Sequence, residues 1–292
     1  MTTLNPEAVK VLVGRGRGLR FTESPRWRDG RFIFIDIHDS AVKSVDLDGR
    51  LETLLQLPFK PNGLGIGPDG RFILCDALHL KVLHDRSGSL EPLADLSEAA
   101  IFCLSDGIVD AQGRYYVGDI GYNFWDPEAA PSRNCVINRV DPDGAVVRVA
   151  EGLAFPNGMV ITPDGRTLIV AETDGERLTA FDIAPDGGLS GRRVFAPLPH
   201  GVSPDGIALD AEGAVWVANP AGAPAVLRVR EGGEVLATLQ LPVHAYAVML
   251  GGPERRHLFI STSASHDPAE IASNPTAQIL LLEVEAAGAG LP

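Results

Sequence analysis

The amino-acid sequence predicts an all-β fold, a six-bladed β-propeller, and three observations carry that prediction. The chain of 292 residues repeats one pattern six times, it contains many turn residues (32 Gly and 22 Pro), and its helical signals are confined to short stretches near 97–102 and 267–273. Repeats of about 40 to 50 residues, each with four strands, are typical of propeller blades. We therefore expect residues 1–292 to form a single six-bladed propeller domain.

Each repeat begins with an anchor residue, followed by a short apolar segment, a turn and a second apolar segment. The segments PNGMVITPDGRTLIVAET at 156–173 and PDGIALDAEGAVWVAN at 204–219 are two clear copies. Successive anchors are 39, 44, 51, 48 and 42 residues apart, and the six are Glu23, Asn62, Asp106, Asn157, Asp205 and Ala247. Two strands joined by a tight turn at this spacing are typical of an antiparallel blade.

The N-terminal segment is expected to complete the last blade. The sixth repeat offers strands near 246–250, 257–262 and 278–284, one fewer than a blade needs. Residues 7–13, EAVKVLV, can supply the fourth strand, which would close the ring and remove an exposed sheet edge. A pair of β-sandwiches is the alternative, and it fits less well because the repeat runs through the whole chain.

Charge and composition exclude several classes of partner. The chain has 38 acidic and 25 basic residues and a formal net charge of −13, so it would repel the phosphates of nucleic acid. It has no apolar run near the roughly 20 residues that span a bilayer. Its three cysteines are an odd number without CxxC spacing, which does not indicate a disulfide framework or a zinc site. We expect a cytoplasmic protein with a small-molecule partner, and the oligomeric state stays open.

Five of the six anchors carry a carboxylate or amide oxygen. Gly follows four of them and Ser24 follows Glu23, and small residues let neighbouring backbones approach closely. In a propeller the first strand of each blade lines the central channel, so these oxygens should converge at one end of it. Oxygen donors from several blades are suited to a hard divalent cation. The alternative, that PNG and PDG are only turns, accounts for the copies at 68–70, 142–144 and 163–165 but less well for the strand-leading ones.

Four segments together resemble those of a known family. They are ESPRW at 23–27, SDGIVDAQGRYYVGD at 105–119, FPNGMVITPDGRTLIVAET at 155–173 and SPDGIALDAEGAVWVA at 203–218. On these segments the chain resembles the senescence marker protein / gluconolactonase / regucalcin-like family of six-bladed propellers, from about residue 8 to about residue 284. The resemblance implies one divalent cation, with Ca²⁺ the first expectation and Zn²⁺, Mg²⁺ or Mn²⁺ as alternatives.

The resemblance also implies roles for individual residues. The family's metal ligands correspond to Glu23, Asn157 and Asp205, and the Asp at this last position is usually proposed as the acid/base group. Many sugar-lactonase members carry an Arg and an Asn in the third blade, where this chain has Cys103 and Ser105. An Arg would offer a fork of donors to a polyhydroxylated acid, and a Cys cannot. A less polar substrate is therefore expected.

Further residues are candidates for contact with substrate. The loop at 121–134 adds aromatic residues, and the candidate contacts are Asn62, Cys103, Ser105, Asp106, Asn123 and Trp125. Asp106 could instead contact the cation. His200 and His244 lie just upstream of inner strands and could reach the pocket, whereas Trp27 and Trp216 lie on repeat strands and are expected in the core.

The sequence thus predicts a metal-dependent hydrolase that opens a lactone or a related ester. The cation would polarise the carbonyl and activate a water, and Asp205 would exchange the proton. Two alternatives remain: a phosphotriester hydrolase or other metal-assisted enzyme of the same fold, and a non-catalytic Ca²⁺-binding or interaction propeller. Rival catalytic sets are weaker, because GRGRG at 14–18 lacks a strand-to-helix context and the chain has no GxSxG or HExxH motif.

Overall fold

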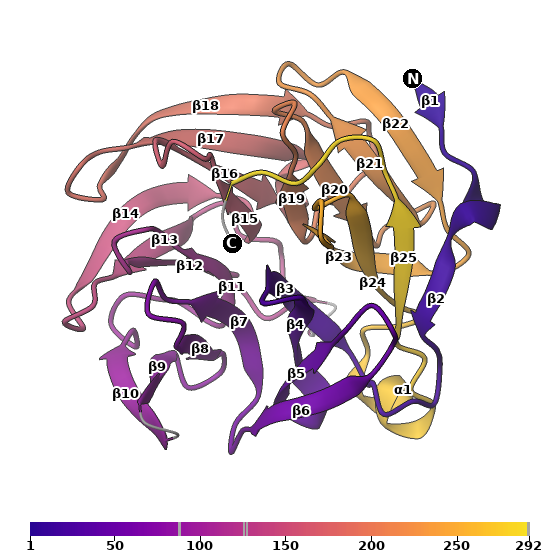
Figure 1. Cartoon of the computed structure of the whole chain (residues 1–292). Helices are drawn as coiled ribbons and strands as arrows, with labels where there is room; N and C mark the ends of the chain where they lie inside the picture. Colours follow the sequence, from indigo (N-terminus) through magenta and orange to yellow (C-terminus); the bar gives the residue numbers. More distant parts are fainter. Residues whose placement is uncertain (87–88, 125, 127, 291–292) are drawn as a thin grey trace.

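The six-bladed β-propeller predicted from the repeats is confirmed. The computed structural model describes residues 1–86, 89–124, 126 and 128–290, and within them the strands form six sheets arranged in a ring (Figure 1). Along the chain each blade begins with its innermost strand, which starts within three residues of an anchor. The strands of the first three blades are β3 (Thr22–Arg28), β4 (Arg31–Asp36), β5 (Ala41–Val45) and β6 (Leu51–Gln56); β7 (Pro61–Ile66), β8 (Phe72–Asp76), β9 (Lys81–Arg86) and β10 (Ser89–Asp95); and β11 (Leu104–Val109), β12 (Tyr115–Asp119), β13 (Cys135–Val140) and β14 (Val146–Leu153).

The last three blades follow the same order and take up the N-terminus. Their strands are β15 (Pro156–Ile161), β16 (Thr167–Glu172), β17 (Arg177–Ile183) and β18 (Leu189–Pro197); β19 (Ile207–Leu209), β20 (Val215–Asn219), β21 (Ala225–Val229) and β22 (Val235–Gln240); and β23 (His244–Gly251), β24 (His257–Ser263), β25 (Gln278–Glu283) and β2 (Lys10–Val13). Strand β2 pairs antiparallel with β25, so the predicted closure of the ring by the N-terminal segment is confirmed.

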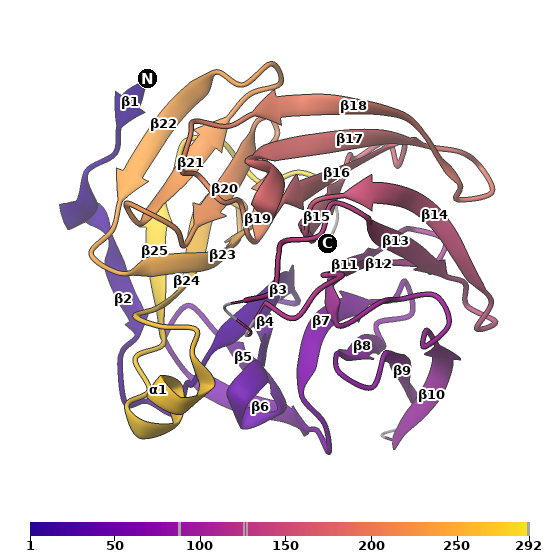
Figure 2. The same ribbon diagram turned by 180° about the vertical axis from the view of Figure 1, so that it is seen from behind.

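The N-terminal segment also pairs with a second blade, which the sequence did not predict. Strand β1 (Thr2–Thr3) pairs in parallel with β22 of the fifth blade, before β2 completes the sixth. The first part of the predicted strand is instead a short 3₁₀ turn, Pro6–Ala8, because the Asn5 side chain accepts a hydrogen bond from the backbone N–H of Glu7. Both views of the ribbon show this segment bridging two blades at the rim (Figures 1 and 2).

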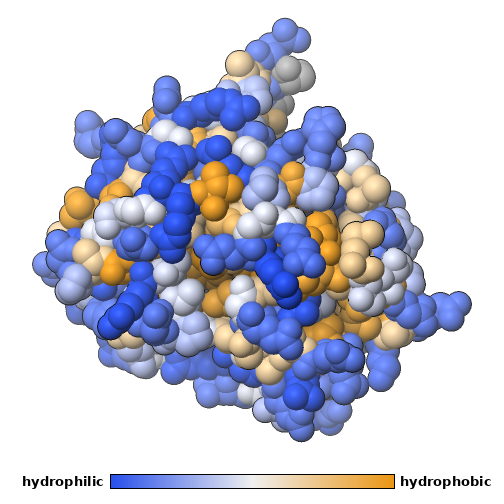
Figure 3. Space-filling view, turned by 90° about the horizontal axis from the view of Figure 1, so that it is seen from above, coloured by the Kyte–Doolittle hydropathy of each residue, from blue (hydrophilic) through white to orange (hydrophobic). Residues whose placement is uncertain are grey.

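Neighbouring blades bury large side chains between them. Phe32 of the first blade stacks on Phe259 of the sixth at a centroid distance of 4.7 Å, and Trp27 stacks on the same ring at 5.3 Å. Trp216 is buried in the core, as expected from its place on a repeat strand. Each fully buried apolar side chain of this size contributes roughly 1.5–3 kcal/mol. The surface seen in Figure 3 is mainly hydrophilic, in keeping with the many charged residues.

The glycines after the anchors allow the inner strands to approach one another. A Cβ atom on Gly158 would lie 2.6 Å from the backbone oxygen of Asp205, and one on Gly206 would lie 2.7 Å from the Cα of Ala247. Real Cβ atoms do not tolerate such distances, so Asn-Gly and Asp-Gly at these positions are required by packing. The close approach expected from the sequence is confirmed here, and it brings the anchor side chains toward one axis.

A second polar position recurs at the end of the second strand in three of the blades. We call Asp36, Asp119 and Glu172, which end the second strands of their blades, the latch carboxylates. They accept hydrogen bonds from the backbone that leads into the inner strand: Asp36 from Phe21 N at 3.0 Å, Asp119 from Ile101 N at 2.8 Å, and Glu172 from Ala154 N at 2.8 Å. Each latch carboxylate therefore fixes the backbone that leads into an inner strand carrying an anchor residue.

The C-terminal segment covers the opposite end of the channel. Ala289 N donates to Leu209 O at 2.9 Å, and Gly288 N donates to Arg255 O at 2.8 Å. Leu209 is the last residue of β19, so the segment crosses the far ends of the inner strands, near the middle of the ring in Figure 1. The short helix α1 (Pro268–Ser273) lies on the pocket side, and none of the helices in the described part of the chain is long and apolar enough to cross a membrane.

Candidate functional site

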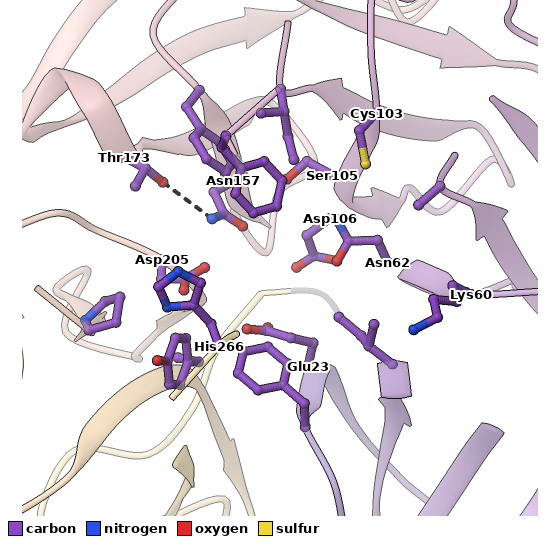
Figure 4. Close-up of a pocket in the computed structure, with 18 of the residues that line it drawn as sticks. Glu23, Lys60, Asn62, Cys103, Ser105, Asp106, Asn157, Thr173, Asp205 and His266 are labelled. Carbon is purple, nitrogen blue, oxygen red and sulfur yellow. Dashed lines mark hydrogen bonds between the residues drawn. The ribbon is translucent and has the colours of Figure 1, made fainter. Parts of the chain in front are cut away.

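A pocket of about 500 Å³ opens where the inner strands begin, and the oxygen-bearing anchors line it (Figure 4). All five contribute to its lining: Glu23, Asn62, Asp106, Asn157 and Asp205. Cys103 and Ser105, two further candidates from the sequence, also line it. The structure thus brings together residues that are as much as 182 positions apart in the chain, at the end of the channel predicted from the repeat.

Glu23 and Asp205 are the two carboxylates of this pocket that have no basic partner among the described residues. Each is only 8% exposed, and no ion pair involves either one in the part of the chain that the structure describes. Burial, together with the charges of Asp205 and Asp106, raises the pKa of Glu23 well above its usual range. Burial and the charge of Asp106 raise the pKa of Asp205 to about 8, against a smaller opposing effect of the Asn157 amide. No described basic side chain therefore stabilises the ionised form of either carboxyl group.

Asn157 is oriented by a residue that sequence reasoning missed. Its Nδ2 donates to Thr173 Oγ1 at 3.2 Å, and the Thr173 hydroxyl donates to the backbone oxygen of Pro204 at 2.7 Å. Thr173 directly follows β16, so it ties the Asn157 amide to the residue that precedes Asp205. No motif marks this threonine in the sequence, because its role depends on the packing of the fourth blade against the fifth.

Asp106 differs from the other two carboxylates because the protein supplies its partners. Its Oδ1 accepts from Ser24 Oγ at 2.7 Å and from Gly107 N at 2.7 Å, and Arg26 lies 3.4 Å away. Burial raises the pKa of Asp106, and the nearby Arg26 guanidinium opposes that effect. Asp106 therefore joins the first and third blades, and Ser24 makes this link from a left-handed backbone conformation with a φ of 49°.

The other polar candidates are partly used within the protein. Asn62 Nδ2 donates to Leu104 O at 2.9 Å, which leaves its oxygen as the group for an external partner. Burial, with a smaller effect of Asp119, raises the pKa of the Cys103 thiol to about 12, so the thiol is neutral near pH 7. Cys75, Cys103 and Cys135 are all buried and free, as expected from their spacing.

Not every predicted contact is part of the pocket lining. Asn123 is exposed and is not among the lining residues, and Trp125 lies outside the described residues, so their contact with substrate stays a prediction. His200 has a nearly fully exposed side chain that lies 3.2 Å from Glu176, away from this pocket. His244 is also not part of the lining.

Two other histidines and a lysine line the pocket instead. His38 Nδ1 lies 3.2 Å from Lys60 Nζ, and burial together with the Lys60 charge lowers the pKa of His38 to about 4. His266 precedes α1 and faces the same space in Figure 4. The position of His38 just after a second strand could have indicated that it lies near the pocket. Nothing in the sequence indicated that Lys60 would lie beside it.

The donor set can be tested against the predicted cation. Among the described residues, no group of three or more His, Cys, Asp and Glu side chains is arranged to hold a metal ion. The predicted set contains two residues of these types, Glu23 and Asp205, and an amide, Asn157. Carboxylate and amide oxygens are the donors that hard divalent cations prefer. Two buried carboxylates without a basic partner also lack the positive charge that burial ordinarily requires, so the set fits such a cation.

Comparisons with known proteins agree with this architecture. A family model described as "SMP-30/Gluconolactonase/LRE-like region" matches residues 21–264. The 6-deoxy-6-sulfogluconolactonase of Pseudomonas putida is 29% identical over 257 residues, which cover 85% of this chain and 85% of that protein. The solved structure of a gluconolactonase from Xanthomonas campestris is 25% identical, covers 93% of this chain and 88% of that one, and has a TM-score of 0.74.

A further structure extends the likeness over the whole chain. It is described as a calcium-binding protein, regucalcin, from Agrobacterium tumefaciens strain C58, and it has a TM-score of 0.79 at 22% identity, covering 100% of this chain and 97% of that one. At this identity the likeness shows the fold. The family model, by contrast, spans all six anchor residues, and the chain therefore belongs to the SMP-30/gluconolactonase/LRE-like family.

Proposed function

We propose that this protein is a divalent-cation-dependent hydrolase that opens a lactone or a related ester. The observation that carries the proposal is the pair of buried carboxylates without a basic partner, Glu23 and Asp205, in a pocket of about 500 Å³. Relatives named as lactonases support the reaction class: the sulfogluconolactonase at 29% identity and the gluconolactonase structure at 25% identity.

Glu23, Asn157 and Asp205 would hold the cation, and Ca²⁺ suits these hard oxygen donors. When bound, the cation supplies Lewis acidity to the carbonyl oxygen and lowers the pKa of a water molecule. Three protein donors leave coordination positions for substrate and water. The Thr173 hydroxyl fixes the Asn157 amide, which keeps the amide oxygen available in one orientation.

Asp205 is the group we assign to proton transfer. It accepts a proton from the water whose oxygen attacks the carbonyl carbon, and it returns that proton to the alkoxide oxygen when the ring carbon–oxygen bond breaks. The product is a hydroxy acid. The neutral, buried thiol of Cys103 is a poor nucleophile, which favours water in this role.

A panel of lactones and esters tests the proposal. The chain is stripped with a chelator and assayed alone and with Ca²⁺, Mg²⁺, Mn²⁺ or Zn²⁺. We expect turnover of at least one lactone or ester to be lost on stripping and restored by one preferred ion. Hydrolysis of phosphotriesters in place of lactones would support the first alternative, whereas ion binding without any hydrolysis would support a non-catalytic calcium-binding propeller.

A further inference from the structure

The pocket has a polar floor and apolar walls. The floor consists of side chains at the start of the inner strands, and Figure 4 shows Glu23, Asn157 and Asp205 facing a common space there. The walls come from the loops between strands, which contribute aromatic and aliphatic residues. A substrate whose carbonyl lies at the floor must therefore place the rest of its structure against hydrocarbon.

One wall is aromatic and lies over the third and fourth blades. Phe124 and Phe155 line the pocket with a ring-centroid distance of 5.9 Å. They pack on a small cluster of buried residues that includes Cys103 and Ile120, both of which also line the pocket. This wall thus has a firm backing, and Cys103 belongs to it by packing.

The facing wall lies over the sixth and first blades. Phe21 and Tyr246 meet edge to face at 4.7 Å, and Ile37 packs against them. Leu78, from the second blade, carries the apolar lining out toward solvent, where it is 48% exposed. Apolar side chains therefore line the pocket from the polar floor toward the surface, and we call the space between the two walls the apolar slot.

Phe155 holds its ring in the pocket from an unfavourable backbone conformation. Its φ is 56°, a left-handed value that is uncommon for a bulky side chain and that Gly adopts freely. Hydrogen bonds impose this geometry, because Phe155 O accepts from Thr173 N at 3.0 Å while the latch carboxylate Glu172 accepts from Ala154 N at 2.8 Å. Strain of this kind is common at functional sites, and in this chain it also occurs outside the pocket, as at Leu80.

The aromatic walls are poorly suited to a substituent covered in hydroxyls, while His38, Lys60, Ser105, Ser203 and His266 also line the pocket. The amide donors of Asn62 and Asn157 and the hydroxyl of Thr173 are already directed to partners within the protein. No Arg is among the described residues that line the pocket. Hydroxyl groups placed against the aromatic walls would lose hydrogen bonds to water without replacement, which disfavours their binding.

We propose that the pocket accepts a lactone or ester whose carbonyl end meets the polar floor and whose substituent is an apolar alkyl or aryl group, with Phe155 and Phe124 determining this specificity. The inference rests on the proposed hydrolase function, which supplies the orientation of the carbonyl. The aromatic wall would contact the part of the substrate that does not react.

The test is a series of γ-alkyl-γ-butyrolactones of increasing chain length, compared with D-glucono-1,5-lactone, on the cation-loaded protein. We expect kcat/KM to rise about two- to fourfold for each added CH₂ until the slot is filled, because each buried CH₂ favours binding by about that factor. A flat series, or a preference for gluconolactone over the alkyl lactones, would overturn the inference while leaving lactone hydrolysis standing.

Matched glycine variants assign the effect to the aromatic wall. Phe155→Gly relieves the backbone strain and removes the ring, and we expect it to reduce the ratio of long-chain to short-chain kcat/KM at least tenfold. Leu80→Gly is the control, because Leu80 has nearly the same left-handed φ, 55°, but does not line the pocket. Phe124→Ala should likewise weaken the rise of kcat/KM with chain length, and it leaves the backbone of Phe155 unchanged. An unchanged series in both pocket variants would contradict the assignment.

Binding of non-hydrolysable analogues separates this inference from the reaction. The 5-alkyl-pyrrolidin-2-ones replace the ring oxygen of the lactone by N–H, and calorimetry measures their affinity without turnover. Affinity that rises with chain length and that falls in Phe155→Gly supports the apolar slot even if no lactone is hydrolysed. Affinity independent of chain length, or no binding of the long-chain analogues, would count against the slot whatever the outcome of the activity assays.

Discussion

Two kinds of buried carboxylate lie side by side in the first blade. Strand β3 pairs with β4 so that Thr22 is opposite Asp36, and Glu23 is the next residue along β3. Asp36 accepts from two backbone N–H groups and lies 2.9 Å from Lys43 Nζ. Glu23 has one hydrogen bond, from the backbone of Ser24, and no basic partner among the described residues. Neighbouring positions of one sheet thus have opposite electrostatic environments.

The same contrast recurs in the fourth and fifth blades. The latch carboxylate Glu172 is buried, which raises its pKa, but hydrogen bonds from Arg177, Thr179 and Ala154 outweigh burial and lower it. Asp205 is also buried, and its pKa is raised. Asp36 and Glu172 thus have basic side chains of the chain itself as partners, whereas Glu23 and Asp205 have none among the described residues, as our proposed cation site requires.

The largest effect should come from neutralising a pocket carboxylate. Asp205→Asn removes the proposed proton acceptor and a cation ligand with almost no change of shape, and we expect turnover to fall by about 10²- to 10⁴-fold while the protein stays folded. Steady-state assays on the cation-loaded protein, with circular dichroism as a check of folding, measure this. Asp164→Asn, in an exposed turn, is the control and should keep full activity. Retention of wild-type turnover by Asp205→Asn would remove Asp205 from the mechanism.

Neutralising a latch carboxylate should affect stability instead. Asp36→Ala leaves the backbone N–H groups of Arg20 and Phe21 without their acceptor and removes one partner of the buried Lys43, so we expect unfolding to become easier by about 3 kcal/mol. Urea denaturation gives the value. Asp48→Ala, on the surface of the same blade, should change stability by less than about 0.5 kcal/mol. Equal values for the two variants would show that the latch contributes nothing.

The pH dependence of the free energy of unfolding should distinguish the pocket carboxylates from the latch carboxylates. In the cation-free protein the pKa of Asp205 is raised to about 8, whereas in the unfolded chain it returns to about 4. Between these values the folded state binds more protons than the unfolded state, so stability should fall as pH rises from about 4 to 8. Because one pKa unit corresponds to about 1.4 kcal/mol, the decrease should be at most about 5 kcal/mol, and it should be smaller in Asp205→Asn, where Glu23, whose pKa is also raised, still contributes. Urea midpoints at pH 5 to 8 in the presence of a chelator test this, and parallel curves for the two proteins would refute it.

The smallest effect should come from Thr173, which only positions a ligand. Thr173→Val removes the hydroxyl that links Asn157 to Pro204, and we expect cation affinity to fall about tenfold. Thr162→Val, beyond the other end of β15, is the matched control and should leave affinity unchanged. Calorimetric titration of both variants measures the difference. An unaltered affinity in Thr173→Val would mean that the Asn157 amide is held by other contacts.

The features that could be predicted from the sequence depend on local patterns. Anchor, turn and strand recur in order, so the blades, the positions of Glu23 and Asp205 and the closing strand followed from spacing. Residues such as Thr173 and Lys60 were missed because their roles arise where separate blades meet, and no local motif marks them. The parallel pairing of β1 and the course of the C-terminal segment also depend on long-range packing, which no repeat encodes.

The proposed cation site is tested by a calorimetric titration of the chelator-stripped protein with Ca²⁺, repeated with Glu23→Gln and Asp205→Asn. We expect one cation per chain in the wild type, an affinity at least tenfold lower in each variant, and a higher unfolding midpoint once the ion is bound. Failure of the wild type to bind Ca²⁺, Mg²⁺, Mn²⁺ or Zn²⁺, or unchanged affinity in both variants, would contradict the claim that Glu23 and Asp205 are compensated by a cation.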